Sequence, residues 1–242
     1  MIPGKVCSRE DIIRLLSSIG GLVKSSTIVY VLGGAALILR GIKDSTIDID
    51  IIADNLKSYN AIVEALTALG FHRETKMKFV NTRTNEIVDL DYGKFIRLRL
   101  YDVMKERAEF LGSFGDLQAF ILSNEHIIFF KSLTERKKDI EDIKTILKKG
   151  NINWRILVRD AVFIAKMELK ERKEKGILLV YELYTSLRII RNSHPELIPK
   201  NVMVELERYA EKYFSKWINL KRRKSPEYRY SNYQYRDLEK NI

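Results

Sequence analysis

The chain has 242 residues, of which 45% are hydrophobic and 31% are charged, so a globular fold is expected rather than a disordered chain. No apolar run approaches the roughly 20 residues that a membrane-spanning helix needs, and charges near the start of the sequence argue against a secretory signal. Cys7 is the single cysteine, which excludes an intramolecular disulfide and a cysteine-rich zinc site, and we expect a soluble cytoplasmic protein with no membrane partner.

Positive charge is concentrated in the C-terminal part of the sequence. Residues 1–150 carry 23 basic and 20 acidic residues, whereas residues 151–242 carry 20 basic and 12 acidic residues. The two parts therefore contribute +3 and +8 to the total net charge of +11. This imbalance favours a polyanionic partner such as RNA or DNA. A lysine-rich surface that only keeps the protein soluble is the alternative interpretation.

The hydrophobic patterns predict a mixed first part and a helical second part. In chain order, we expect helices at about 8–20, 35–40 and 56–69, and strands at 28–32, 47–53, 77–81, 86–92, 95–103 and 117–122. A long helical stretch follows from Ser123 to Gly150, and three more helices are expected at about 153–175, 177–192 and 199–220. The fold class predicted is α+β: a mixed sheet with flanking helices in residues 1–150, a helical domain in 151–220 and a basic, tyrosine-rich tail in 221–242.

A pair of glycines separates the first strand from a short helix. Gly33 and Gly34 follow the apolar run 28–32 directly. Glycines let the backbone approach a ligand closely, and the N–H groups that begin a helix attract anions. The pattern is compatible with phosphate binding, although many tight turns share it.

Two strands carry acidic residues at alternate positions. Asp48 and Asp50 lie between isoleucines, and Asp89 and Asp91 lie between other apolar residues. Alternation places the carboxylates of each pair on one face of its strand. Like charges so close together repel, and a divalent cation relieves that repulsion. Three carboxylates can hold two Mg²⁺ ions, although a solvated acidic face is the alternative for each strand.

These residues together resemble the polymerase-β-like nucleotidyltransferase superfamily. Its mark is a hydrophobic strand, two small residues, a short helix and a strand with two aspartates, which here are Leu32-Gly33-Gly34 and Ile47-Asp48-Ile49-Asp50-Ile51. A second stretch is similar to uncharacterised prokaryotic nucleotidyltransferases akin to AbiEii-type toxins. Its residues here are Glu125, Lys131, Arg136, Lys138, Asp139 and Asp142.

The resemblance covers about residues 8–150 and implies a nucleotidyltransferase-like fold that transfers a nucleotidyl group from an NTP, with Mg²⁺ or Mn²⁺ as cofactor. Asp48 and Asp50 would bind the metal, and Asp89 would be the third catalytic carboxylate, with Asp91 as its rival. Gly33 and Gly34 would hold the triphosphate.

Three more residues are nucleotide-binding candidates by the same resemblance: Thr46, Lys43 and Lys131. Relatives carry an arginine two residues before the position of Thr46, where this chain has Asp44, so Lys43 is the candidate substitute. Lys131 could reach a phosphate. For Asp139 and Asp142 we favour a structural polar network with Arg136 and Lys138.

Three functions fit these observations. The first is a metal-dependent nucleotidyltransferase that acts on an RNA acceptor such as tRNA, and the resemblance to AbiEii-type toxins adds the hypothesis of a toxin with an antitoxin partner. The second is a non-catalytic module on the same fold that binds a nucleic acid or a protein. The third is a nucleotidyltransferase for a small molecule, which would not need a basic C-terminal part.

The tail combines a basic run with aromatic residues. Lys221 to Lys224 supply four consecutive positive charges, and four tyrosines follow within residues 225–242. Cations attract a phosphate backbone and aromatic rings stack on unpaired bases, which favours RNA. The alternative is that the tyrosines pack on the protein or on a second subunit.

Overall fold

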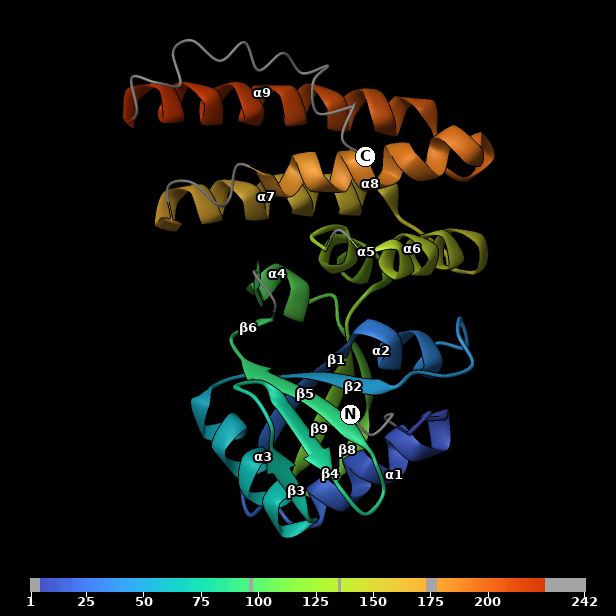
Figure 1. Cartoon of the computed structure of the whole chain (residues 1–242), viewed down its shortest axis with the longest axis vertical. Helices are drawn as coiled ribbons and strands as arrows, with labels where there is room; N and C mark the ends of the chain where they lie inside the picture. Colours follow the sequence, from blue (N-terminus) through green and yellow to red (C-terminus); the bar gives the residue numbers. More distant parts are fainter. Residues whose placement is uncertain (1–4, 96–97, 135, 173–177, 225–242) are drawn as a thin grey trace.

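The computed structural model describes residues 5–95, 98–134, 136–172 and 178–224 (Figure 1). The α-helices are α1 (Arg9–Gly20), α2 (Gly33–Leu39), α3 (Leu56–Ala68), α4 (Asp102–Lys105), α5 (Asn124–Ser132), α6 (Lys137–Lys149), α7 (Trp154–Arg172), α8 (Leu178–Ser193) and α9 (Lys200–Lys224). The strands are β1 (Thr27–Leu32), β2 (Asp48–Ala53), β3 (Phe71–Arg73), β4 (Lys78–Asn81), β5 (Ile87–Tyr92), β6 (Lys94–Phe95), β7 (Leu98–Arg99), β8 (Glu109–Phe114) and β9 (Leu117–Ile121).

Seven of the strands form one mixed sheet, in the order β3-β4-β5-β2-β1-β9-β8. The β2–β5 and β1–β9 pairs are parallel, and the other neighbours are antiparallel. Helices flank this sheet and the remaining helices follow it in the chain, so the α+β prediction is confirmed.

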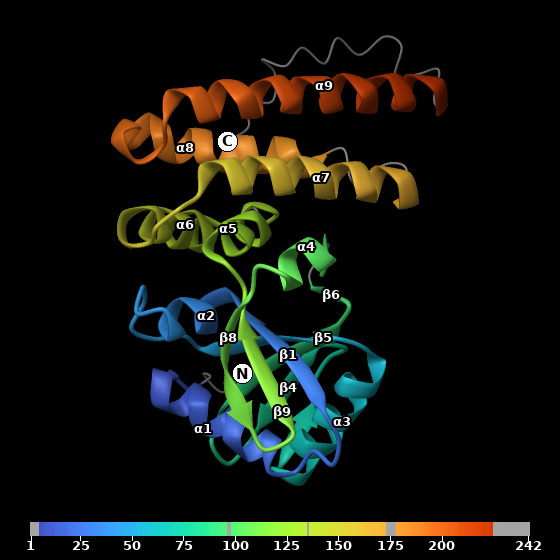
Figure 2. The ribbon, with the colours of Figure 1, turned by 180° about the vertical axis from the view of Figure 1, so that it is seen from behind.

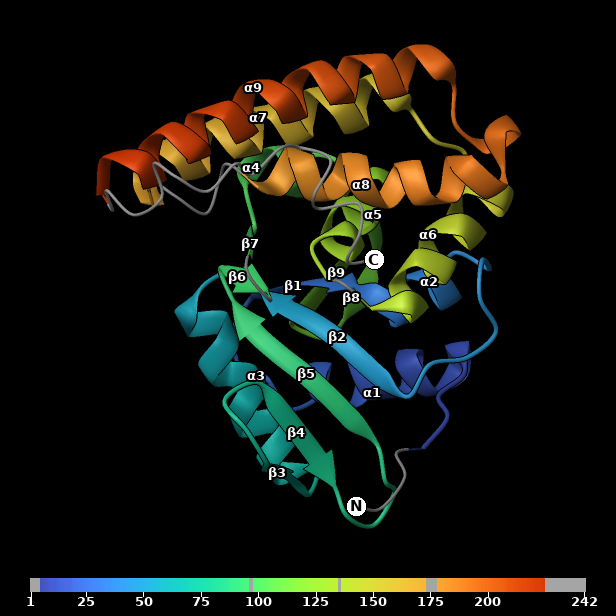
Figure 3. The same cartoon turned by 45° about the horizontal axis from the view of Figure 1, so that its top comes forward.

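The two faces of the sheet differ in chemistry. On one face Ile49, Ile51, Val88 and Leu90 are almost wholly buried. Helices α1 and α3 lie behind the sheet in Figure 3, α3 against β1, β2 and β5 and α1 against β8 and β9. The alternate positions of β2 and β5 carry aspartates, which therefore project from the opposite face.

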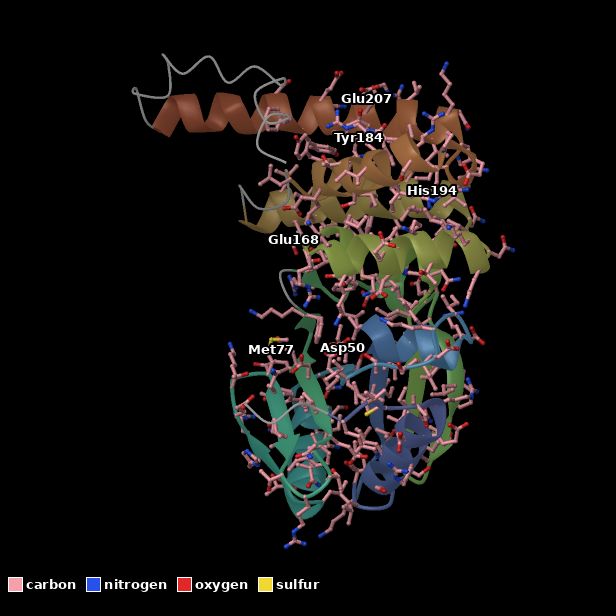
Figure 4. All side chains as sticks on the ribbon, turned by 45° about the vertical axis from the view of Figure 1, so that its right-hand side comes forward. Asp50, Met77, Glu168, Tyr184, His194 and Glu207 are labelled. Atoms are coloured by element: carbon pink, nitrogen blue, oxygen red, sulfur yellow. The ribbon has the colours of Figure 1, made fainter. Side chains whose placement is uncertain are left out.

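The other helices are stacked in layers above the sheet. Helix α2 packs directly on β1 and β2, α5 and α6 lie above it, α7 and α8 cross above them, and α9 forms the outermost layer (Figures 1 and 2). The Tyr184 hydroxyl on α8 donates to Glu207 Oε1 on α9 at 2.7 Å, and Figure 4 labels both residues. None of the helices in the described ranges combines the length and apolar character needed to cross a membrane.

Two parts of the sequence-based prediction were wrong. Residues 95–103 do not extend the main sheet: Gly93 adopts a φ of +62°, and the chain then forms the small β6–β7 pair and α4. The stretch 123–149 is not continuous but is divided into α5 and α6. Strands β3 and β8, at the two edges of the sheet, were not anticipated.

The proposed division at residues 150 and 220 stays a prediction. Helix α9 continues to Lys224, so the basic run Lys221–Lys224 is the end of that helix rather than part of a separate tail. The tyrosines predicted to stack on RNA lie outside the described residues.

Candidate active site

The glycines between β1 and α2 make room for the acidic strand. Gly33 has a φ of +60°, and a Cβ atom there would lie 1.7 Å from Asp50 Oδ2. A Cβ on Gly34 would lie 2.4 Å from Thr46 Oγ1. Both distances are far inside van der Waals contact. The absence of a side chain at Gly33 and Gly34 therefore allows the Asp50 and Thr46 side chains to pack against the backbone of the turn.

Strand register brings three carboxylates together. Asp50 lies opposite Leu32 in antiparallel β1 and beside Asp89 in parallel β5. One carboxylate oxygen from each of Asp48, Asp50 and Asp89 lies within 4.8 Å of the others. Thr46 Oγ1 donates to Asp48 Oδ1 at 3.2 Å, which helps to orient that carboxylate. Acidic oxygens at this spacing are the ligands that Mg²⁺ and Mn²⁺ prefer.

Asp91 lies outside this group of three. It is two residues further along β5, beside Ile52, and is 6% exposed. Its Oδ1 accepts a hydrogen bond from the Tyr92 backbone N–H at 2.9 Å. The structure thus separates the two aspartates that the alternating pattern could not distinguish.

The three carboxylates repel one another when no cation is present. Burial, together with the charges of Asp48 and Asp89, raises the pKa of Asp50 to about 8. Burial and the charge of Asp48 likewise raise the pKa of Asp89. A bound divalent cation would remove this penalty, so the donor set fits such a metal by charge as well as by geometry.

Two further aspartates, Asp139 and Asp142 on α6, line the same cleft as the three carboxylates of the sheet. Lys131 Nζ on α5 donates to Asp139 Oδ1 at 2.9 Å and to Asp142 Oδ2 at 2.6 Å, both on α6. Lys43 Nζ donates to the other oxygen of Asp142 at 2.9 Å, and Arg136 Nε donates to Asp139 Oδ2 at 2.6 Å. Asp139 and Asp142 thus lie in a polar network with Lys131 at its centre; Arg136 belongs to it as predicted, whereas no hydrogen bond or ion pair of Lys138 is found among the described residues.

Charges within this network stabilise one another. Burial alone would lower the pKa of Lys131, but the neighbouring Asp142 and Asp139 raise it above its ordinary value. Burial alone would raise the pKa of Asp139, but Lys131 and the Thr134 hydroxyl lower it. The pair Lys131–Asp139 is thus fully ionised at neutral pH. The partly exposed cations beside it are those of Lys43 and Arg136.

The three carboxylates and the ion pairs of Lys131, Lys43 and Arg136 line one cleft between the sheet and helices α5 and α6. Its volume is about 150 Å³, and its walls combine the aspartates with every predicted nucleotide-binding residue except Gly33, which lines a smaller adjoining hollow. Met77 and Phe95 also line the cleft, and Figure 4 shows Met77 at the height of Asp50. Both were missed because each is an apolar residue of an expected strand, 77–81 or 95–103, and such a residue does not signal a site.

Replacement of Gly33 tests the packing of the turn. We expect Gly33→Ala to lower the free energy of unfolding by about 2–5 kcal/mol, because it adds a backbone strain and a clash with Asp50. Gly41→Ala is the matched control, since Gly41 has a φ of +69° but nothing lies within 4 Å of its Cβ position. It should cost only about 1 kcal/mol. Equal losses in urea unfolding would contradict the close packing at Gly33.

Comparison with protein families bears on the chemistry of this cleft. A family model described as "Nucleotidyltransferase of unknown function (DUF6036)" matches residues 10–184. The matched region runs from α1 into α8 and contains every residue of the cleft. A search among curated proteins finds no match.

Proposed function

The chain belongs to the DUF6036 family of nucleotidyltransferases, and from this premise we propose that Asp48, Asp50 and Asp89 bind a divalent metal and catalyse transfer of an NMP from an NTP. The observation that carries the proposal is the convergence of three carboxylate oxygens within 4.8 Å in a cleft that also contains cations. The resemblance to the polymerase-β-like superfamily and to AbiEii-type toxins supports the same assignment at a finer level.

The reaction needs four events at one place. An acceptor hydroxyl forms a bond to the α-phosphorus, the bond from that phosphorus to the bridging oxygen breaks, pyrophosphate leaves, and the hydroxyl proton is removed. We assign the proton to Asp89, the third carboxylate of the group, because one of its oxygens lies within 4.8 Å of those of Asp48 and Asp50 and therefore beside the place where the attacking hydroxyl would bind. Mg²⁺ or Mn²⁺, when bound by Asp48 and Asp50, would supply positive charge for the triphosphate and the attacking oxygen.

Residues across the cleft would hold the triphosphate. The Lys43 side chain is 30% exposed, lines the cleft and makes one ion pair among the described residues, with Asp142, so its ammonium is accessible to a phosphate. Thr46 and the backbone at Gly33 and Gly34 lie beside Asp48 and Asp50, where the metal-bound end of the nucleotide would sit. Lys131 is buried and already has two carboxylate partners, so we place its effect on the nucleotide second to its effect on α6.

The excess of positive charge after residue 150 supports an RNA acceptor such as tRNA. The resemblance to AbiEii-type toxins extends the proposal to a toxin controlled by an antitoxin protein. Incubation of the protein with each labelled NTP, Mg²⁺ and total cellular RNA, followed by gel electrophoresis, tests the activity directly. Labelled RNA that appears with one NTP and disappears with EDTA is the expected result. Labelled small molecules in place of RNA would contradict the RNA acceptor.

The two aspartates of β5 should differ strongly in function. We expect Asp89→Asn to lower turnover by about 100-fold or more, because it removes a ligand and the proposed base. Asp91→Asn should lower turnover by less than about threefold, since its carboxylate bonds to the Tyr92 backbone outside the group of three. Steady-state kinetics of the two isosteric variants decide the assignment, and the reverse order of losses would transfer the role to Asp91.

A further inference from the structure

The exposed side chains of α7 form one stripe along the helix. Among its side chains that the structure describes, through Lys170, those classed as exposed are Arg155, Arg159, Phe163, Lys166 and Lys170. Their spacings of four, four, three and four residues place them on a single helix face. Four of the five are cationic and the fifth is an aromatic ring. A stripe of one sign is unlike an ordinary surface helix, on which both signs are interspersed.

The stripe borders a groove between α7 and α9. A hollow of about 640 Å³ lies between these helices. Phe163 and Lys166 line both this hollow and a second one of about 360 Å³ beside it. Glu205 is the single carboxylate among the described residues that line the two hollows. Figure 2 shows α7 in front of α8 and below α9, on the outer side of the molecule.

Within the described residues, the cations of the stripe have few ion-pair partners. No ion pair is found for Arg155, Lys166 or Lys170 within the described part of the chain. Arg159 contacts Asp160 at 3.1 Å but keeps 56% of its side chain exposed. Phe163 is 46% exposed at the middle of the stripe, although burial of its ring would be favourable. Both observations make this face suited to a partner with negative charge and flat apolar surfaces.

We propose that the α7–α9 groove binds single-stranded RNA, with Arg155, Lys166 and Lys170 on the phosphates and Phe163 stacked on a base. An acidic amphipathic helix is the rival occupant, but such a helix needs several exposed apolar anchors, and Phe163 is the one large exposed apolar side chain in the described lining. Cations interleaved with an exposed ring are what an unpaired strand uses. The choice of RNA over DNA rests on the proposed function.

The groove is held in a fixed position relative to the cleft. On the buried faces of α7, the Tyr101 hydroxyl donates to Glu168 Oε1 at 2.8 Å, and Arg107 Nε donates to Asp160 Oδ2 at 2.7 Å. Both partners come from the segment around α4, which follows the strand that carries Asp89. A strand bound in the groove is therefore anchored to the same body that carries the three carboxylates.

The test measures binding of a fluorescein-labelled uridine 12-mer by anisotropy, with the full chain and without NTP or metal. We expect the triple variant Arg155→Gln/Lys166→Gln/Lys170→Gln to weaken binding at least tenfold. The slope of log affinity against log salt should fall by about 2, since each lost phosphate contact contributes about 0.7. Phe163→Ala should weaken binding by about tenfold without changing the salt slope, because it removes stacking rather than charge.

The matched control is Lys24→Gln/Lys57→Gln/Lys76→Gln, which removes three exposed charges from the sheet part of the molecule. Equal losses in the two triple variants would show diffuse attraction and overturn the proposal. Equal affinity for a duplex RNA or for a thymidine 12-mer would also overturn it. So would a competition experiment in which an acidic helical peptide, but no unlabelled single-stranded RNA, displaces the labelled 12-mer. The Asp48→Asn/Asp50→Asn variant should bind the 12-mer normally. If the groove variants bind the 12-mer as the wild type does while Mg–NTP binding is intact, the groove proposal fails and the proposed nucleotidyl transfer is unaffected.

Discussion

Replacement of both Asp48 and Asp50 by asparagine should reduce nucleotidyl transfer by about 1,000-fold or more and abolish Mg–NTP binding, while the protein still folds. The amide keeps the size of each side chain but removes the charge that attracts the metal, and metal-dependent stabilisation of the reacting phosphate amounts to several kcal/mol. Isothermal titration calorimetry with Mg–NTP measures the binding, and gel assays measure the transfer. The matched control is Asp44→Asn/Asp116→Asn, at two exposed positions outside the cleft.

The same variant should change how stability depends on pH. Burial and the charges of Asp48 and Asp89 raise the pKa of Asp50 to about 8, above the value of about 3.9 expected for an unfolded chain. The folded state therefore keeps a proton that the unfolded state loses, and the metal-free wild type should become less stable as pH rises from about 4 to 8. The asparagine variant should lack this slope. An asparagine variant that is less stable than the metal-free wild type at pH 8 would contradict the repulsion among the carboxylates. A variant that binds Mg–NTP normally would place the metal elsewhere.

Local patterns were sufficient for the elements that hold the carboxylates. The Ser8–Asp11 capping box begins α1 as predicted, because its two hydrogen bonds are formed within four residues of sequence. The alternation around Asp48 and Asp50 predicted β2 within one residue of its observed start. Each of these signals depends on neighbours in sequence, and for this reason the order strand, glycine turn, helix, acidic strand could be recognised.

Contacts between distant residues could not be predicted in the same way. The choice between Asp89 and Asp91 depends on the parallel register of β2 and β5, which no local pattern specifies. The ion pair of Lys43 with Asp142 joins residues 99 positions apart. Edge strand β8 was missed because its half-exposed residues and Gly112 resemble a loop, and it is ordered by pairing with β9. These features arise from packing of the whole chain.

Replacement of Lys131 by methionine should lower the free energy of unfolding by about 3–5 kcal/mol. The Lys131 side chain is 8% exposed, and its ammonium is the shared partner of Asp139 and Asp142, which are 1% and 10% exposed. Methionine retains most of the apolar volume but leaves two buried carboxylates without this cation. Urea unfolding followed by circular dichroism measures the loss. Lys43→Met, which removes a partly exposed cation from the same Asp142, should cost about 1 kcal/mol or less.

The role of Lys131 is separated from a direct role in nucleotide binding by a compensating variant. Lys131→Met combined with Asp139→Asn and Asp142→Asn removes the buried charges as a set, so a large part of the lost stability should return. If the stability returns and the KM for NTP stays within about threefold of the wild type, Lys131 acts by fixing α6 against α5. The opposite result would be an unchanged unfolding midpoint in Lys131→Met with a KM for NTP raised tenfold or more. Because the ammonium would then have to leave both carboxylates to reach a phosphate, that result would make Lys131 a triphosphate ligand and Asp139 and Asp142 its resting partners.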